Sequence, residues 1–170
     1  MKALSSVVSI LVFIFMTNVV MADSGTDSSA GNGMINKKSH YDVKTTLDRL
    51  ENILKKKGIT IVTRWSHSDG AARAGIPLRP TELLIFGNPK LGSHFFTSNQ
   101  TAGIDLPMKA LAWQDAKGNV WLTYNDPTYI ANRHGIKDRP KIVQKMTGAL
   151  NKLTNKATMP DTPAAPAARK

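Results

Sequence analysis

Apolar residues along this chain change their spacing several times, and each spacing predicts a different secondary-structure element. Between Asp42 and Lys57 they recur every three or four residues, which predicts an amphipathic helix that Ser39 or Asp42 caps and Gly58 ends. From Ile59 to Trp65 apolar and polar residues alternate, which predicts a half-buried strand. One side of that strand would carry Ile59, Ile61, Thr63 and Trp65.

The middle of the chain predicts a short helix, a second strand and a third helix. Residues 67–74 suit a helix closed by Gly75, after which two prolines keep the chain extended. Residues 82–86 form a nearly continuous apolar run, which is typical of a buried strand. A helix is expected from Lys90 to about Gln100, followed by a loop over residues 101–107.

A β-hairpin is the clearest local unit in the sequence. Residues 108–114 and 120–125 are rich in β-forming side chains, and a five-residue connection joins them. Gly118 in that connection can adopt a positive φ, as hairpin turns often require. Trp113 and Trp121 would then pack across the two strands.

Two further helices and a tail complete the predicted fold. Asn125 or Asp126 can cap a helix that has Pro127 at its first position and runs to His134. A basic helix over residues 137–156 has a stripe of Ile142, Val143, Met146, Leu150 and Leu153 to dock on the domain. Residues 157–170 are rich in proline and alanine and are predicted to be disordered.

These elements, taken in order, predict a single α+β domain. Its antiparallel sheet would carry helices packed on one face, with the C-terminal helix as an addition. The chain has no cysteine, so disulfides, thiol nucleophiles and thiolate metal sites are excluded. The fold must therefore be stabilised by packing alone.

The N-terminus has the layout of a signal peptide. Lys2 precedes an apolar run from about Val7 to Met21, and small residues precede a cut between Ala22 and Asp23. An uncleaved membrane anchor is the alternative, because the run is nearly as long as a membrane-spanning helix. Residues 1–22 are thus predicted to direct export to the periplasm or the exterior, and residues 23–33 to form a flexible leader.

The net charge of +11 is concentrated in two segments. Residues 37–57 contain seven Lys or Arg and three acids, and residues 137–156 contain six and one. Such runs usually form solvated helix faces, and the alternative is an anionic partner surface. Nucleic acid is not expected as a partner, because the chain is predicted to be exported and its basic helices lack interleaved aromatic residues.

Four short motifs resemble a known family. They are Arg79-Pro80-Thr81-Glu82, Phe86-Gly87-Asn88-Pro89, Gly103-Ile104-Asp105-Leu106-Pro107 and Tyr124-Asn125-Asp126-Pro127. Their order and spacing are similar to those of the bacterial and archaeal family called domain of unknown function 302. The resemblance covers about residues 34–136 and leaves the basic C-terminal helix outside.

The resemblance implies a fold like that of the TATA-box-binding protein, with a curved antiparallel sheet, and often a homodimer. It implies no chemistry, because a fold by itself transfers no function. The chain departs from the family pattern at residues 93–96, which are more aromatic than the family's stretch. Any ligand contact that the family shares at that point is therefore not carried over.

No catalytic constellation can be recognised in the sequence. It has no nucleophile elbow, phosphate loop, paired metal-binding histidines or dinucleotide fingerprint. The sequence therefore predicts no catalytic residue, no metal and no cofactor. The adjacent residues 66–69 hold serine, histidine and aspartate, but neighbours on one turn point different ways. The four histidines are far apart, and His67 and His134 lie beside the family block.

Polar residues at strand ends and in loops are the best candidates for a binding site, because loops on a rigid sheet commonly carry binding groups. The candidate binding residues are Arg79, Glu82, Asn88, Lys90, Asp105, Asn125 and Asp126. The alternative, which we favour, is that these residues cap helices, fix turns and form ion pairs.

Three functions follow as hypotheses. The first is an exported, non-enzymatic module that binds a small ligand of unknown identity or another partner. The second is a hydrolase-like enzyme in which Glu82, Asp105 or Asp126 serves as general base. The third is electrostatic attachment to anionic lipid or polysaccharide through the helices at 37–57 and 137–156.

Overall fold

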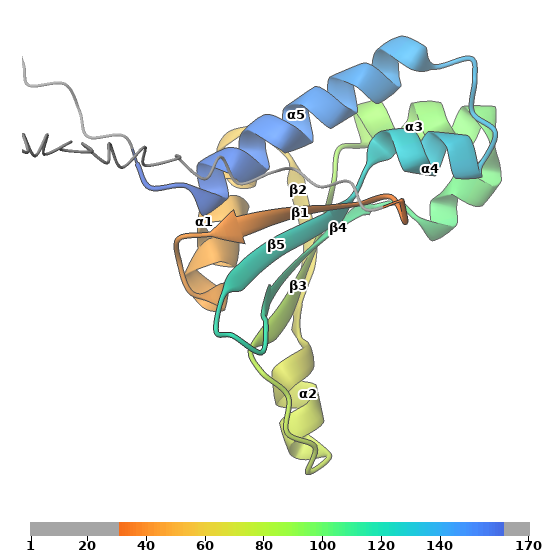
Figure 1. Cartoon of the computed structure of the whole chain (residues 1–170). Helices are drawn as coiled ribbons and strands as arrows, with labels where there is room; N and C mark the ends of the chain where they lie inside the picture. The colour runs from red at the N-terminus through yellow and green to blue at the C-terminus, as the bar shows by residue number, and fades with distance from the viewer. Residues whose placement is uncertain (1–30, 162–170) are drawn as a thin grey trace, which may run out of the picture.

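The computed structural model describes residues 31–161, which form one five-stranded antiparallel sheet with helices packed against it (Figure 1). The strand order is β1-β5-β4-β3-β2, so β1 and β2 are the edges. In chain order the elements are β1 (Met34–Ser39), α1 (Val43–Lys56), β2 (Thr60–Ser66), α2 (His67–Arg73), β3 (Thr81–Gly87), α3 (Pro89–Ser98), the 3-10 helix η1 (Gln100–Ile104), β4 (Met108–Gln114), β5 (Val120–Asn125), α4 (Pro127–Arg133) and α5 (Pro140–Thr158).

Helices α1 and α5 pack against each other and cover one face of the sheet (Figure 1). The core lies between these two layers, where Leu47, Leu50, Leu84 and Leu122 have no exposed surface. The predicted α+β class, with an antiparallel sheet and helices on one face, is confirmed. Helix α2 is different, because it has no buried residue and projects beyond the end of the sheet.

The edge strand β1 was not predicted, because its sequence MINKKS has no apolar alternation. It pairs with β5 and turns Lys37 inward, where only 6% of that residue is exposed. The Lys37 ammonium group donates to the backbone oxygen of Asn151 at 3.0 Å and to the side-chain oxygens of Asn151 and Asn155. A lysine in the strand therefore tethers β1 to α5.

The predicted strand at residues 59–65 exists as β2, but the assignment of its two faces was wrong. A register shift between Ile61 and Thr63 inserts a bulge, and the side chains after the bulge exchange faces. Trp65 is consequently 54% exposed, while Arg64 points toward α1 and pairs with Asp48. The bulge depends on pairing with β3, so the alternation within β2 did not indicate it.

The predicted hairpin is confirmed with its bounds unchanged. Trp113 lies opposite Trp121, and their stacked rings have centroids 6.5 Å apart. Gly118 adopts a φ of 82° in the connection. Asp115 accepts hydrogen bonds from the indole N–H of Trp121 and from Asn119, and these bonds lower the pKa of its carboxyl well below the ordinary value.

Three predictions at the ends of elements need comment. Residues 101–107 were expected to form a loop, and their first part is the 3-10 helix η1. Helix α5 continues to Thr158, and residues 157 and 158 are buried, so the tail begins later than predicted. The predicted signal peptide at 1–22 and most of the predicted leader and tail lie outside the described residues. Within 31–161, no helix is both long and apolar enough to cross a membrane.

We predict that Gly148→Ala stabilises the protein by about 1 kcal/mol. Glycine inside a helix costs about that much relative to alanine, and, apart from its chain neighbours and the nearby backbone of α5, a Cβ at this position would meet no atom within 4 Å. Urea unfolding should show a higher midpoint with an unchanged slope. Gly58→Ala is the control and should destabilise, because Gly58 has a φ of 66°. An unchanged midpoint for Gly148→Ala would contradict this assignment.

Candidate ligand cavity

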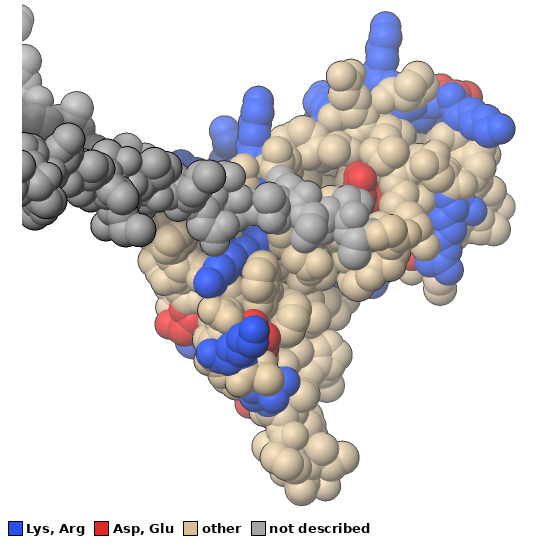
Figure 2. All heavy atoms as spheres, viewed as in Figure 1, with Lys and Arg blue, Asp and Glu red and all other residues tan. Residues whose placement is uncertain are grey.

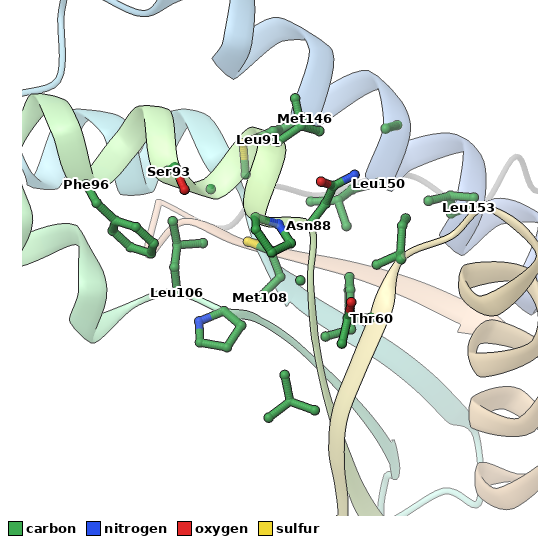
Figure 3. Close-up of a pocket in the computed structure, with 18 residues that line it drawn as sticks. Thr60, Asn88, Leu91, Ser93, Phe96, Leu106, Met108, Met146, Leu150 and Leu153 are labelled. Carbon is green, nitrogen blue, oxygen red and sulfur yellow. The ribbon is translucent and has the colours of Figure 1, made fainter.

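An apolar cavity of about 310 Å³ lies at one edge of the sheet, where β2, the end of β3, α3 and α5 meet (Figure 3). Its walls are formed mainly by Phe86, Leu91, Phe96, Leu106, Met108, Met146 and Leu150. Among the side chains labelled in Figure 3, the polar ones are Thr60, Asn88 and Ser93. The cavity therefore suits an apolar ligand with a few polar contacts.

The turn between β3 and α3 forms one wall of the cavity. Asn88 caps α3 by accepting a hydrogen bond from the backbone N–H of Lys90 at 3.0 Å, and Pro89 occupies the first helical turn. Gly87, just before this cap, lies against Pro107, since a Cβ there would be 3.2 Å from the proline Cβ. Because Gly87 has no side chain, Pro107 in the turn before β4 can approach β3 and close one side of the cavity.

A hydrogen-bonded brace holds η1 against the end of α4, next to the cavity wall. One carboxylate oxygen of Asp105 lies 2.8 Å from Nε2 of His134, and Nδ1 of the same ring lies 2.8 Å from the hydroxyl of Thr101. Asn99 completes the brace by donating to the backbone oxygen of His134 at 2.8 Å. The side chains of Asp105 and His134 are only 11% and 7% exposed.

The brace places a hydroxyl, an imidazole and a carboxylate in the order used by hydrolase triads. The hydroxyl of Thr101 also contacts the side-chain oxygen of Asn99 at 2.8 Å, and Asp105 also pairs with Arg133 at 3.2 Å. Thr101 and Asp105 thus have further structural partners, and Leu106, the residue after Asp105, lines the cavity. We interpret the brace as the support that positions this wall.

The seven sequence candidates do not meet in one place. Arg79 and Glu82 lie toward the end of the sheet that carries α2, where Arg79 donates to the backbone oxygen of Gln114 at 3.0 Å. Glu82 accepts from Arg64 at 2.5 Å and 2.8 Å. Arg64 also bonds to Asp48, and hydrogen bonds from Lys44 and Arg64 lower the pKa of the Asp48 carboxyl. Arg64, Glu82 and Asp48 thus form an ion-pair cluster at this end of the sheet.

The other five candidates lie toward the opposite end of the sheet. Asn88 lines the cavity, Lys90 is exposed on α3, and Asp105 belongs to the brace. Asn125 is the last residue of β5, and Asp126 caps α4 by accepting from the backbone N–H of Thr128 at 2.9 Å. The alternative of caps, turns and ion pairs therefore describes most of the set, and Asn88 alone among the seven lines the cavity.

Sequence reasoning did not find the apolar residues of the cavity or the role of His134. The apolar residues have the same sequence pattern as core positions, and no spacing in the sequence connects Thr101, Asp105 and His134. A second hollow of about 530 Å³ between α4 and α5 is more open and more polar. Across residues 31–161 no group of three or more His, Asp or Glu side chains is arranged to hold a metal ion.

Comparison with known families gives one assignment. The family model for the domain of unknown function DUF302 matches residues 35–153. The chain belongs to the DUF302 family. The match extends beyond the residues that carried the sequence resemblance and includes most of α5, which that resemblance had left outside. The helix that walls the cavity is thus part of the DUF302 domain.

A solved structure has the same fold. The crystal structure of an uncharacterized conserved DUF302 protein from Bacillus stearothermophilus aligns with a TM-score of 0.67 and 19% identity. The alignment covers 74% of this chain and 98% of the other. At that identity the likeness establishes the fold alone.

Three curated relatives are 44% identical over 104 residues, which is 61% of this chain. They are the fluoride-specific ion channels FluC 1 of Brucella suis, FluC 1 of Brucella abortus and FluC 2 of Brucella melitensis. The matched segment spans 41% of the first and 38% of each of the others. This chain therefore corresponds to about two-fifths of each relative.

We predict that His134→Ala lowers the free energy of unfolding by about 1–3 kcal/mol, because it leaves the nearly buried carboxylate of Asp105 without its closest partner. Arg133→Ala is the matched control. It removes the other partner of Asp105, but Arg133 is 53% exposed, so the expected change is within about 0.5 kcal/mol. Urea unfolding of both variants measures the difference, and equal losses would show that the brace has no special role.

Proposed function

We propose that this protein is an exported, non-enzymatic module that binds a small, mainly apolar ligand in the cavity between β2, α3 and α5. The observation that carries the proposal is the cavity itself, about 310 Å³ in volume and lined almost entirely by apolar side chains. Ligand pockets are typically apolar hollows of about 300–1,000 Å³ with a few polar groups, so the cavity is at the small end of that range.

The proposed binding energy comes from the burial of apolar ligand surface. Each Å² removed from water contributes about 25 cal/mol, which makes a short hydrocarbon chain a suitable occupant of such a cavity. Thr60, Asn88 and Ser93 supply the polar contacts that would orient the ligand. Loss of the polar end of a ligand should therefore change its affinity less than loss of the hydrocarbon portion.

The surroundings of the carboxylates favour a binding module over the hydrolase hypothesis. Glu82 is paired with Arg64, and Asp126 caps α4, so both have structural partners. Asp105 remains as the candidate general base of that hypothesis, and its bonds to His134 and Arg133 suit the brace described above. No feature of these three residues points to catalysis more strongly than to support.

Export is part of the proposal and rests on the N-terminal signal-peptide pattern, with a cut between Ala22 and Asp23. Fluoride conduction is not part of it, because the match to the Brucella channels covers only about two-fifths of each of them. A homodimer, which the family resemblance implied, stays a prediction.

We predict that purified protein binds 1-octanol and that Gly92→Leu weakens this binding at least tenfold. Gly92 lines the cavity, and the nearest atom to an added Cβ lies 3.9 Å away on Phe96, so a leucine would occupy the space. Isothermal titration calorimetry gives the affinity, and a tenfold loss corresponds to about 1.4 kcal/mol.

Gly70→Leu provides the matched control for this experiment. It makes the same substitution in helix α2, at the far end of the sheet from the cavity, and should leave octanol binding unchanged. Absence of octanol binding to the unmodified protein would count against the proposal. So would equal weakening by the two leucine substitutions, because it would separate binding from the cavity.

A further inference from the structure

Four lysines lie along one exposed side of α5. Lys141, Lys145, Lys152 and Lys156 are separated by four, seven and four residues, so at 3.6 residues per turn they fall within an arc of about 60°. All four are exposed, and α5 contains no acidic residue. Figure 2 shows basic side chains projecting from the surface along α5. We call these four residues the lysine row.

Several basic residues of helix α1 have acidic partners, and most of the lysine row has none. In α1, Lys44 pairs with Asp48 at 2.8 Å and Lys55 with Glu51 at 2.6 Å. Arg49 pairs with Asp161 at 2.9 Å. No acidic group in the described part of the chain forms an ion pair with Lys141, Lys145 or Lys152. Lys141, Lys145 and Lys152 therefore present positive charge that no ion pair in the described part of the domain neutralises.

The lysine row adjoins the apolar cavity. Ala149 lines the cavity, and it lies four residues after Lys145 and three before Lys152. Residues at these spacings are about 5–6 Å apart on a helix surface, measured between Cβ atoms. Lysine stems can lie along apolar surface while the ammonium group stays in water, so both ammonium groups can reach a ligand at the edge of the cavity.

We infer that the ligand is an anionic amphiphile, with a short hydrocarbon chain in the cavity and a carboxylate or phosphate head bound by Lys145 and Lys152. This inference rests on the proposed function, because it specifies the chemical class of ligand for the same cavity. The hydrocarbon chain meets the walls of α3, β3 and α5, and the charged head stays at the solvated side of α5. A free fatty acid and a bilayer lipid share this chemistry.

The charged head should give a salt-dependent preference. Octanoate and 1-octanol have the same chain length, so their affinities differ mainly through the head group. At 20 mM NaCl we expect octanoate to bind about tenfold more tightly than octanol, measured by calorimetry at pH 7.5. At 0.5 M NaCl the difference should nearly disappear, because exposed charges are screened within a few ångströms at that ionic strength.

The double variant Lys145→Glu/Lys152→Glu tests the position of the head group. It should abolish the octanoate preference and leave octanol binding within about twofold. Lys38→Glu/Lys117→Glu is the matched control, because it changes the net charge equally at exposed residues of β1 and the hairpin connection, away from the cavity. That control should retain most of the octanoate preference.

The outcomes separate this inference from the proposed function. Failure of both octanol and octanoate to bind would remove the proposed function itself. Octanol binding without an octanoate preference, or an equal loss of preference in the two double variants, would overturn the anionic-head inference and leave the apolar cavity as a ligand site.

Vesicles distinguish the two sources of such a ligand. Sedimentation with phosphatidylglycerol vesicles, compared with phosphatidylcholine vesicles, should retain the protein if a bilayer lipid is the source, and Lys145→Glu/Lys152→Glu should release it. An octanoate preference without vesicle binding identifies a free anionic amphiphile instead.

Discussion

Burial of a single apolar sheet face under α1 and α5 is the constraint on which the rest of this structure depends. The sheet has no disulfide to support it, so its cohesion comes from side chains such as Leu47, Leu84 and Leu122, which have no exposed surface. Helix α5 must lie close enough to pack on α1 and to receive Lys37 from β1. Its position across the sheet is therefore determined by contacts at several separate points.

The position of α5 also explains where the cavity forms. Helix α3 begins directly after the end of β3, and residues of α3, α5 and the edge strand β2 together line the cavity (Figure 3). Apolar side chains from these elements face one another there without filling the space. The brace of Asp105 and His134 supports the wall of the cavity that contains Leu106. The cavity thus forms at the edge of the sheet, because the side chains of α3, α5 and β2 do not fill the space between these elements.

Membership of the DUF302 family places this chain among proteins of one fold and assigns no activity. The case for binding therefore comes from the cavity and from the unneutralised lysines beside it. Helix α5 takes part in both, because it contributes apolar residues to the cavity on one side and carries lysines on an adjacent side. An amphiphile requires that combination, and an ordinary surface helix docked on a complete core would not leave an apolar cavity next to its charged side.

The sequence by itself determined the five α-helices, four of the five strands and the hairpin, because hydrogen bonds and side-chain periodicity within each element are local. It also determined the lysines of α5, since their spacing follows the helical period. Only the tertiary structure decided that MINKKS pairs as β1, that a bulge turns Trp65 outward, and that Arg79 and Glu82 lie far from Asp105. These features depend on contacts between residues far apart in the chain, which no local pattern records. The cavity belongs to the same group, because its walls come from four separate segments and a core residue has the same pattern whether or not space remains beside it.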